Sequence, residues 1–454
     1  MNVIRDFSAR LYEMFLRARG WYGDACHGNP LRKWTCKISN AIEAPDATEA
    51  ERSCQLANII AYAKKNTVFY SRVEGEKLSD FPVISKNVIR EAYQEFVVPA
   101  DRIPGQVGDV HVQETSGSTG VAFKVFQDTL CRTRRLALIR AANERMGFKT
   151  FLPMMHIRAV KHHWNFKGDL HWKKDLRILY ADNSCMDEAK TDRMAQAVID
   201  YGIRVIRGYM TSLDTLTRYM VEHNVRPRGK LLFISVGELL LETLRDRIVN
   251  DLHCNVVSQY GNEENGILGQ SDINGSGTDM RLYLANCFVE VLKLNADVPV
   301  ADGELGRIVV TDLANRAMPM IRYDIGDLAM VGERSENGEV RALKALSGRK
   351  TDLIYKTDGT PLDFWNSIPI EIFKSPNINQ WQFIQRQKRA YVLRTCIKPG
   401  HQIDEPRFIS LLKSVLGQDA DVEIQIVDEI PVLNSGKRKA IVNEFTQKKG
   451  RETR

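Results

Sequence analysis

The side chains best equipped for chemistry gather in one short stretch of hydroxyls and glycines, Glu114-Thr115-Ser116-Gly117-Ser118-Thr119-Gly120. Glycines let a backbone turn tightly and bring its N–H groups close to an anion. The four hydroxyl side chains add hydrogen-bond donors, and Lys124 brings a positive charge close by. This equipment suits the phosphates of a nucleotide, although a solvated Ser/Gly turn has the same composition.

Apolar, β-branched runs flank this stretch and predict two strands with a loop between them. The first run covers 110–112, and the second covers 121–126. The common phosphate loop, G-x-x-x-x-G-K-[ST], opens a helix instead, and its Gly-Lys-Ser/Thr end is missing here. No G-x-G-x-x-G follows a predicted strand, so a nucleotide-dependent oxidoreductase is disfavoured.

Helical patterns dominate the first hundred residues. A helix is predicted over 50–65, with Cys54 and Ile60 on its apolar face. Ser85 is the expected N-cap of a second helix over 86–96. These helices precede the hydroxyl-rich loop in the sequence.

Short apolar strands alternate with helices after the loop, a rhythm typical of a parallel sheet covered by helices. The predicted elements are a helix over 128–147, a strand over 151–160, a helix over 186–201, a strand over 205–208, a helix over 212–223, a strand over 231–236, a helix over 242–251 and a strand over 255–259. In such sheets, ligands bind beyond the carboxyl ends of the strands. Loops at 209–213, 235–238 and 258–261 fall at these ends, so we expect them to line one crevice.

Further motifs follow the loop in a fixed order. They are Tyr260-Gly261-Asn262-Glu263-Glu264, Gly303-Glu304-Leu305-Gly306-Arg307-Ile308-Val309-Val310-Thr311, Tyr323-Asp324-Ile325-Gly326-Asp327, Gly348-Arg349-Lys350-Thr351-Asp352 and Pro431-Val432-Leu433-Asn434-Ser435-Gly436-Lys437. With the loop, they resemble the T-S-G-S-T-G, Y-G-x-[ST]-E, G-E-x-G-x-[IL]-x-x-T, Y-x-[TS]-G-D, G-R-x-[DK]-D and P-x-[TL]-x-S-G-K motifs of the adenylate-forming superfamily. The spacing to Lys124 and the chain length most resemble its phenylacetate–CoA ligase and capsule-biosynthesis branch.

The resemblance implies a role for each motif. Tyr260 would stack on adenine, and Glu264 would bind Mg²⁺. Asp327 would accept hydrogen bonds from both ribose hydroxyls, and Arg349 would reach the phosphates or the ribose. Lys437 would bridge the substrate carboxylate and the α-phosphate during adenylation, so that Lys437 and Glu264 are the implied catalytic residues. The implied nucleotide-binding residues are Thr115, Ser116, Gly117, Ser118, Thr119, Gly120, Lys124, Gly237, Glu238, Tyr260, Gly261, Asp327 and Arg349.

Three motif positions depart from the family. Glu263 and Ile325 stand where it usually has hydroxyl residues, and Thr351 stands at a hinge position that is commonly Asp or Lys. A second carboxylate beside ATP would repel phosphate unless Glu263 turns away or joins the metal site. A small polar residue such as Thr351 can still absorb a backbone rotation, so the hinge is retained.

The resemblance also implies the fold and the domain organisation. The expected fold is α/β, with a large N-terminal domain of helix-covered mixed or parallel sheets at 1–347. A small, mobile α+β C-terminal domain at 348–454 would carry Lys437. The length of 454 residues agrees, because it exceeds what one ordinary core requires.

Composition excludes several other classes. Apolar content of 43% and charged content of 27% are those of a soluble globular protein. The net charge of +7 is dispersed except in the basic tail at 437–454, which argues against a nucleic-acid partner and suits an anionic substrate such as ATP or coenzyme A. Residues 1–23 carry charges among apolar positions, so an amphipathic helix is expected rather than a signal peptide or a membrane span.

Cysteine usage predicts the compartment. The eight cysteines include no C-x-x-C pair, which indicates reduced thiols, mostly filling the core, in a cytoplasmic chain. Membrane partners are not expected, and the sequence leaves the oligomeric state open, a homodimer included.

The predicted function is AMP-forming ligation of a small carboxylic acid. ATP and Mg²⁺ would convert the acid to an acyl-adenylate, and a thiol, coenzyme A as first choice, would then take the acyl group. Alternatives are a carrier-protein thiol acting in trans, or an amine or hydroxyl acceptor in polysaccharide or natural-product biosynthesis. A catalytically silent nucleotide-binding or scaffold homologue is an alternative of another class.

The acid itself cannot be named from the sequence. An apolar pocket is suggested by four residues that could equally belong to the core, namely Tyr209, Met210, Val236 and Leu239. No acidic residue occurs between 151 and 167, which argues weakly against an amino-acid substrate. The segment 161–167 is interpreted as a surface loop, with a lid near the substrate as the alternative.

Overall fold

The computed structural model describes residues 2–115, 123–159, 168–227, 229–362, 367–368, 372, 375, 377–398, 400–431 and 439–445. For residues 2–10, Thr115 and Asn379 it describes the backbone alone. The predicted phosphate loop at 116–120, the segment 161–167 and Lys437 lie outside these ranges.

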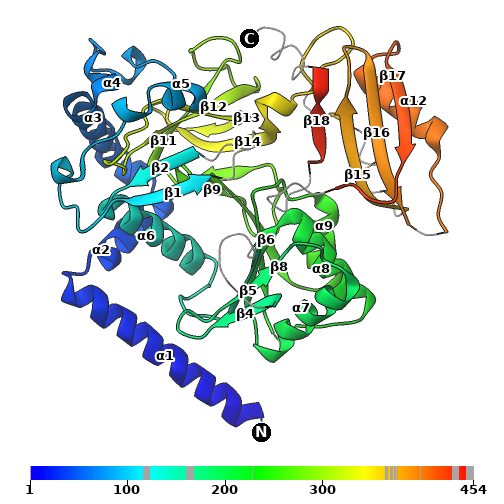
Figure 1. The fold of residues 1–454 in the computed structure, drawn as a ribbon, viewed down its shortest axis with the longest axis horizontal. Helices are drawn as coiled ribbons and strands as arrows, with labels where there is room; N and C mark the ends of the chain where they lie inside the picture. Colours follow the sequence, from blue (N-terminus) through cyan, green and yellow to red (C-terminus); the bar gives the residue numbers. More distant parts are fainter. Residues whose placement is uncertain are drawn as a thin grey trace.

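Helices form the N-terminal part. They are α1 (Asn2–Cys26), α2 (Pro30–Glu43), α3 (Glu49–Asn66), α4 (Val68–Ser71) and α5 (Lys86–Glu91). Helix α1 lies at the periphery of the molecule (Figure 1), where Arg17 Nε donates to the Thr150 carbonyl at 2.9 Å. Ser85 caps α5 as predicted, because its hydroxyl accepts a hydrogen bond from the Val88 N–H at 3.4 Å. The helix ends at Glu91 rather than Phe96, and a 3₁₀ turn at Tyr93–Glu95 follows it.

The predicted apolar face of α3 is partly wrong. Ile60 is buried as expected, whereas Cys54 is exposed. The buried face instead contains Arg52, whose guanidinium binds the carboxylate of Glu339 across the domain. Arg52 therefore occupies a buried position of the helix that an apolar residue would usually fill. Hydrophobic periodicity alone does not predict such a position, because the residue there is charged.

The predicted strand pair around the loop is present. Strands β1 (His111–Thr115) and β2 (Phe123–Gln127) form an antiparallel hairpin whose last pair is Thr115 with Phe123. Helix α6 (Thr129–Arg145) follows, and the Asp128 carboxylate caps it by accepting from the Cys131 N–H at 2.8 Å. The hairpin thus holds both ends of the predicted phosphate loop in a fixed register.

One sheet of twelve strands occupies the centre, in the order β11-β12-β13-β14-β10-β9-β8-β7-β6-β3-β5-β4. Its parallel part consists of β3 (Met154–Arg158), β5 (Ile178–Asp182), β6 (Val205–Tyr209), β7 (Leu232–Val236) and β8 (Asn255–Asn262), with β4 (Leu170–Lys173) antiparallel at the edge. Helices α7 (Glu188–Asp200), α8 (Met210–Glu222) and α9 (Glu242–Asp246) pack on one face around a large apolar core. The predicted βα alternation is confirmed for β3, β6, β7 and β8, whereas β4 and β5 were not predicted.

The other half of this sheet is antiparallel. Its strands are β9 (Gly266–Gln270), β10 (Met280–Leu282), β11 (Cys287–Leu292), β12 (Gly306–Asp312), β13 (Tyr323–Arg334) and β14 (Val340–Arg349). A second apolar core, which includes Leu268, Val310 and Leu343, lies against these strands. Strands β12, β13 and β14, which carry the later motifs, therefore belong to the same continuous sheet as the parallel part.

A separate sheet of four strands forms the C-terminal part (Figure 1). It contains β15 (Ile378–Gln385), β16 (Ala390–Ile397), β17 (Asp421–Ile426) and β18 (Ile441–Asn443), in the order β17-β16-β15-β18, with helix α12 (Glu405–Leu416) packed on a core of its own. The predicted α/β fold with a smaller α+β part is confirmed. The boundary at 347/348 stays a prediction.

Two composition-based expectations have different outcomes. All eight cysteines are free thiols, but only Cys131, Cys254 and Cys287 are buried, so the expectation that most of them fill the core is wrong. The exposed ones lie mainly on helices whose buried faces use other residues. Among the helices that the structure describes, none combines the length and apolar content needed to cross a membrane.

Candidate active site

The carboxyl ends of the parallel strands lie in one row, as predicted. Tyr209 at the end of β6 pairs with Val236 at the end of β7, and Val236 pairs with Gln259 on β8. Strand β8 continues beyond this row and turns back into β9. The Tyr260–Glu264 motif therefore occupies the place where the parallel and antiparallel halves of the sheet meet.

Tyr260, Asp327 and Arg349 meet at this junction although they come from three separate motifs. The Tyr260 hydroxyl donates to Asp327 Oδ2 at 3.0 Å, and Arg349 Nε lies 3.9 Å from Asp327 Oδ1. Antiparallel pairing of β13 with β14 places Asp327 directly opposite Arg349. Burial, followed by the Asp327 charge, raises the pKa of Tyr260 well above its usual value, so the phenol remains a hydrogen-bond donor.

Glu264 lies in a second polar cluster beside the first. The residue is 6% exposed, and Oε1 is 3.0 Å from Lys86 Nζ and 3.4 Å from the Tyr323 hydroxyl. Burial first, and then the Glu264 carboxylate, raise the pKa of Tyr323, which therefore stays protonated and donates. Lys86 belongs to the first turn of α5, so Glu264 joins the N-terminal helices to the central sheet.

These residues fit a magnesium ion that is held chiefly by nucleotide phosphates. Within the described ranges, no cluster of three or more His, Cys, Asp or Glu side chains could form a metal cage of its own. Mg²⁺ in nucleotide sites commonly uses one or two carboxylates and completes its shell with phosphate and water. Glu264 offers one such carboxylate, at the position where Lys86 now supplies the positive charge.

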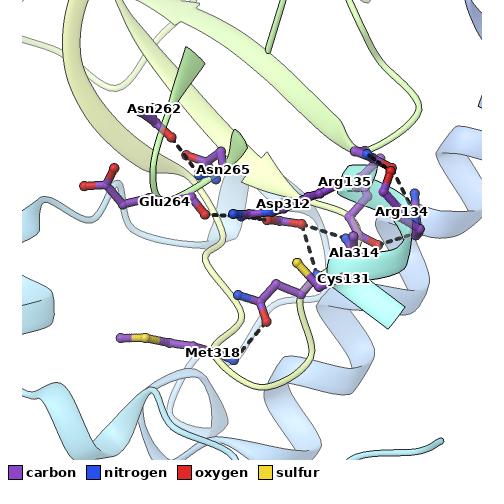
Figure 2. A network of polar contacts seen from close by, with 12 residues as sticks. Cys131, Arg134, Arg135, Asn262, Glu264, Asn265, Asp312, Ala314 and Met318 are labelled. Carbon is purple, nitrogen blue, oxygen red and sulfur yellow. Dashed lines mark hydrogen bonds and ion pairs between the residues drawn. The ribbon is translucent and has the colours of Figure 1, made fainter. Parts of the chain in front are cut away.

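Arg135 of α6 fixes the turn that carries Glu263 and Glu264 (Figure 2). Its guanidinium donates to both of their backbone carbonyl groups and lies 3.5 Å from Asp312 Oδ2. Asp312 is itself held by the backbone N–H groups of Ala314 and Asn315, at 2.7 and 3.0 Å. The turn is therefore tied to α6 and to the end of β12 before any ligand binds.

The departing residue Glu263 turns toward the hairpin. Its Oε2 accepts a hydrogen bond from Gln113 Nε2 of β1 at 2.8 Å. Of the two outcomes expected for this extra carboxylate, the structure thus shows it directed at β1 and not bonded with Glu264. The same contact holds the hairpin against the β8–β9 turn.

Lys124 lies on β2, directly opposite Glu114 on β1. Its Nζ is 3.3 Å from Glu114 Oε1, and both side chains are more than half exposed. Exposed ion pairs of this kind contribute little to stability. Lys124 can therefore turn from Glu114 to an incoming phosphate at small cost.

Gly237 and Glu238 occupy the loop after β7. Gly237 has a φ of 70°, a conformation that favours glycine. The Glu238 carboxylate accepts from the Thr211 N–H at 2.9 Å and from the Thr211 hydroxyl at 3.1 Å. Glu238 thus caps the start of α8 and fixes two of the three predicted loops relative to each other.

The four suggested pocket residues do not share one apolar surface. Met210 packs against the core under α7 and α8, Val236 against the opposite face of the parallel strands, and Leu239 against the core of the antiparallel half. Tyr209 is partly buried at the start of α8. Their assignment to an acid pocket stays a prediction.

Sequence reasoning missed three side chains that complete these clusters: Lys86, Tyr323 and Arg135. Lys86 and Tyr323 each stand in a segment that the sequence singles out, at the start of the predicted second helix and at the start of the Tyr323–Asp327 motif. Both residues could have been predicted by looking in these segments for a cation or a hydroxyl group to pair with the Glu264 carboxylate. Arg135 has no comparable signal, because it is one of several arginines on a helix.

Comparison with known proteins agrees with this architecture. Residues 366–444 match the family model of the CapK C-terminal domain. The chain is 21% identical to Protein CapK of Staphylococcus aureus over 85% of this chain and 86% of that one. It is 24% identical to a phenylacetate-coenzyme A ligase of Pseudomonas putida over 82% of this chain and 77% of that one.

A solved structure shows the same fold. The crystal structure of 2-hydroxyisobutyryl-CoA ligase in the postadenylation state, in complex with R3-HIB-AMP, superposes with a TM-score of 0.65 at 16% identity. The match covers 90% of this chain and 92% of that one. Over most of its length this chain is therefore similar to CapK and to the phenylacetate–CoA ligases of the adenylate-forming superfamily, and it has the fold of a solved acyl-CoA ligase.

Proposed function

We propose that this protein is an AMP-forming carboxylate ligase that uses ATP and Mg²⁺ and transfers the acyl group to a thiol, that of coenzyme A in the first instance. The observation that carries the proposal is the meeting of Tyr260, Asp327, Arg349 and Glu264 in two adjoining polar clusters. They come from three motifs separated by up to 89 residues, since 349 − 260 = 89. The named activities of the related ligases support the same reaction.

The first half-reaction activates the carboxylate of the substrate acid, which is by itself a poor electrophile. A carboxylate oxygen bonds to the α-phosphorus of ATP, and the bond to pyrophosphate breaks, leaving an acyl-adenylate. The protein has to align the two reactants and stabilise the charge that develops on phosphorus. A Glu264-bound Mg²⁺ would supply Lewis-acid stabilisation of the phosphate oxygens.

This chain's own side chains would position the nucleotide. Asp327 would release the Tyr260 hydroxyl and accept from the ribose hydroxyls, while Tyr260 presents its ring to adenine. Lys86, freed from Glu264 when the metal binds, would add a positive charge beside the phosphates. The 115–120 loop and Lys124 would hold the β- and γ-phosphates, and Lys437 would bridge the carboxylate and the α-phosphate.

The second half-reaction transfers the acyl group. The thiol sulfur bonds to the acyl carbon as it loses its proton, and AMP departs. We propose that the part beyond residue 348 rotates about Arg349–Thr351 between the two steps. Lys350 donates to the Leu294 carbonyl on the large part at 2.9 Å, and Asp352 binds Lys439 beside the C-terminal sheet at 3.1 Å. At the proposed hinge, Lys350 thus contacts the large part, whereas Asp352 contacts the C-terminal part.

ATP–pyrophosphate exchange with a panel of acids tests the first step. Exchange that requires an acid, is abolished by EDTA and returns with Mg²⁺ is the expected result. AMP release that depends on coenzyme A, on a carrier-protein thiol, or on an amine or hydroxyl compound then identifies the acceptor. Absence of both exchange and nucleotide binding would favour a catalytically silent scaffold homologue.

A further inference from the structure

The outward face of helix α1 is apolar. Large apolar side chains recur along it at spacings of three and four residues, which places them on one side of a helix. They are Leu11, Met14, Phe15, Trp21 and Tyr22, and each is at least half exposed. Ala18 and Ala25 share this spacing and are exposed as well. These seven residues form an apolar strip that faces solvent, which we call the α1 strip.

The α1 strip is a local concentration of exposed apolar surface. The described part of the chain exposes fifteen large apolar side chains, and five of them lie on α1 between Leu11 and Tyr22. No other described helix or strand carries more than two. Single exposed apolar residues are normal on protein surfaces, whereas a contiguous patch marks a site of interaction with another molecule or a membrane. The strip is therefore a candidate binding surface.

The opposite side of α1 holds the helix on the body of the protein. Leu16 is 4% exposed, and Arg17 Nε donates to the Thr150 carbonyl at 2.9 Å. Glu13 Oε2 lies 3.7 Å from Arg177 Nη1. The usual polarity of a surface helix is thus reversed, because charged side chains contact the body and apolar ones face solvent. These contacts leave the strip on the outer side of a peripheral helix (Figure 1).

Two arginines border the α1 strip. Arg19 is exposed and stands four residues after Phe15 and three before Tyr22, so it lies beside both on the helix surface. On α2, the guanidinium carbon of Arg32 lies 5.6 Å from the centre of the Trp21 ring. Within the described ranges, neither arginine has a carboxylate partner. Both cations are therefore available to an anion next to the strip.

The acidic side chains that the structure describes on α1 are engaged within the protein. Glu13 binds Arg17 and Arg177 on the inner side of the helix. The Asp24 carboxylate accepts from the backbone N–H groups of Leu31 and Arg32 at 3.0 and 2.9 Å, so it holds the first turn of α2. The charge available beside the strip is thus positive, which suits an anionic occupant.

A second copy of the chain fits the α1 strip poorly. At about 1.5 Å per residue, a 25-residue helix is about 37 Å long, and with a diameter of about 10 Å it offers roughly 400 Å² to a partner helix. A stable interface buries about 800 Å² on each side. Pairing two strips about a two-fold axis would also bring the bordering arginines of both copies together, which like-charge repulsion opposes.

We propose that the α1 strip binds the surface of a membrane that contains anionic phospholipids. The helix lies in the plane of the headgroups, with Leu11 and Phe15 reaching the acyl chains and Trp21 and Tyr22 at the level of the headgroups. Arg19 and Arg32 contact the lipid phosphates. The apolar strip and its basic borders thus match the two layers that such a surface presents.

This mode of binding needs no spanning segment. None of the described helices has the length and apolar content to cross a membrane, and a helix that lies on the surface does not have to. The proposal replaces the sequence-based expectation that membranes are not partners. It does not depend on the proposed ligase function.

Flotation of the full-length protein with lipid vesicles tests the proposal. Vesicles of phosphatidylcholine alone are compared with vesicles of an equimolar mixture of phosphatidylcholine and phosphatidylglycerol. The wild-type protein should bind the mixed vesicles at least about fivefold more tightly, since each arginine near an anionic surface contributes about this factor. This comparison needs no variant.

Two double variants separate the apolar part of the binding from the ionic part. Phe15→Ser/Trp21→Ser should weaken binding to both kinds of vesicle by at least about tenfold. Arg19→Gln/Arg32→Gln should weaken binding to the mixed vesicles by about fivefold or more and leave binding to phosphatidylcholine within about twofold. Val68→Ser on α4 removes a similarly exposed apolar side chain, 55% against 58% for Phe15, and should change neither. An unchanged Tm would show that each variant is folded.

Three outcomes would overturn the proposal. The first is absence of wild-type binding to both kinds of vesicle. The second is full binding by Phe15→Ser/Trp21→Ser, which would place the contact outside the α1 strip. The third is a wild-type dimer, seen by light scattering, that this double variant converts to a monomer while neither protein binds vesicles, which would assign the strip to a second copy. Failure of ATP–pyrophosphate exchange would remove the proposed function and leave this inference standing.

Discussion

Two ends of the strand edge differ in how their charges are paired: the proposed nucleotide end on β8, β13 and β14, and the β3–β6 end. At the proposed nucleotide end, Glu264 faces Lys86, and Asp327 faces Arg349 and Tyr260. At the β3–β6 end, the half-buried Arg207 donates to the side-chain carbonyl of Gln259. Under the proposed function, the residues of the nucleotide end are held in place by the fold and would exchange these partners for the ligand.

The largest effect should follow from removing the charge at the nucleotide end. Glu264→Gln keeps the size and the hydrogen-bonding capacity of the side chain but loses the proposed metal ligand. We expect acid-dependent pyrophosphate exchange to fall by about 10²–10³ in kcat. An unchanged Tm would show that the fold is intact, and exchange within about tenfold of wild type would exclude a catalytic role for Glu264.

Asp327→Asn should act on binding more than on rate. The amide can still accept from Tyr260 but loses the charge that strengthens its hydrogen bonds to the ribose. We expect the KM for ATP to rise by about 10- to 100-fold with a smaller change in kcat. A matching loss in kcat at unchanged KM would place Asp327 in the chemical step instead.

Arg135→Leu should reveal how firmly the Glu263–Glu264 turn is held. The substitution leaves the two carbonyl groups and the buried Asp312 without the guanidinium, which we expect to lower the free energy of unfolding by about 3 kcal/mol. Urea unfolding measures this loss. Arg132→Leu, on an exposed position of the same helix, is the matched control and should change stability by less than about 0.5 kcal/mol.

The free energy of unfolding should depend on pH through His156, at the β3–β6 end. Because the folded-state pKa of His156 lies well below 6.5, the unfolded chain binds the proton more readily. The contribution of this group is complete above pH 6.5 and is lost as the pH falls from 6.5 toward the folded-state pKa. His156→Gln should reduce the difference in unfolding free energy between pH 7.5 and pH 5.5. An unchanged difference in unfolding free energy would contradict a His156 that is neutral in the folded protein.

Lys124→Ala should have the smallest effect on stability. Its ion pair with Glu114 is exposed, so we expect a change of less than about 1 kcal/mol in the free energy of unfolding. A rise in the KM for ATP, together with a change in the free energy of unfolding below this value, would indicate the proposed phosphate contact. If both stability and KM are unaffected, Lys124 has no role in nucleotide binding.

Several features of this protein could be read from the sequence. The βα alternation predicted β3, β6, β7 and β8 to within a few residues, because buried strands and amphipathic helices carry strong local periodicity, but it missed β4 and β5. Ser85 and the hairpin around the predicted loop were found for the same reason, since capping and strand patterns act over a few residues. The order of the motifs indicated the resemblance to the adenylate-forming superfamily without any knowledge of the contacts between them.

Only the tertiary structure decided which side chains face one another. Lys86 with Glu264, Arg135 with the 263–264 turn, and Arg52 in place of an apolar residue all join segments more than 100 residues apart. Local sequence carries no information on such pairs, because a buried charge is tolerated only where the fold brings it a partner. The contact of Arg207 on β6 with the amide of Gln259 on β8 likewise becomes visible only once the strands are placed side by side.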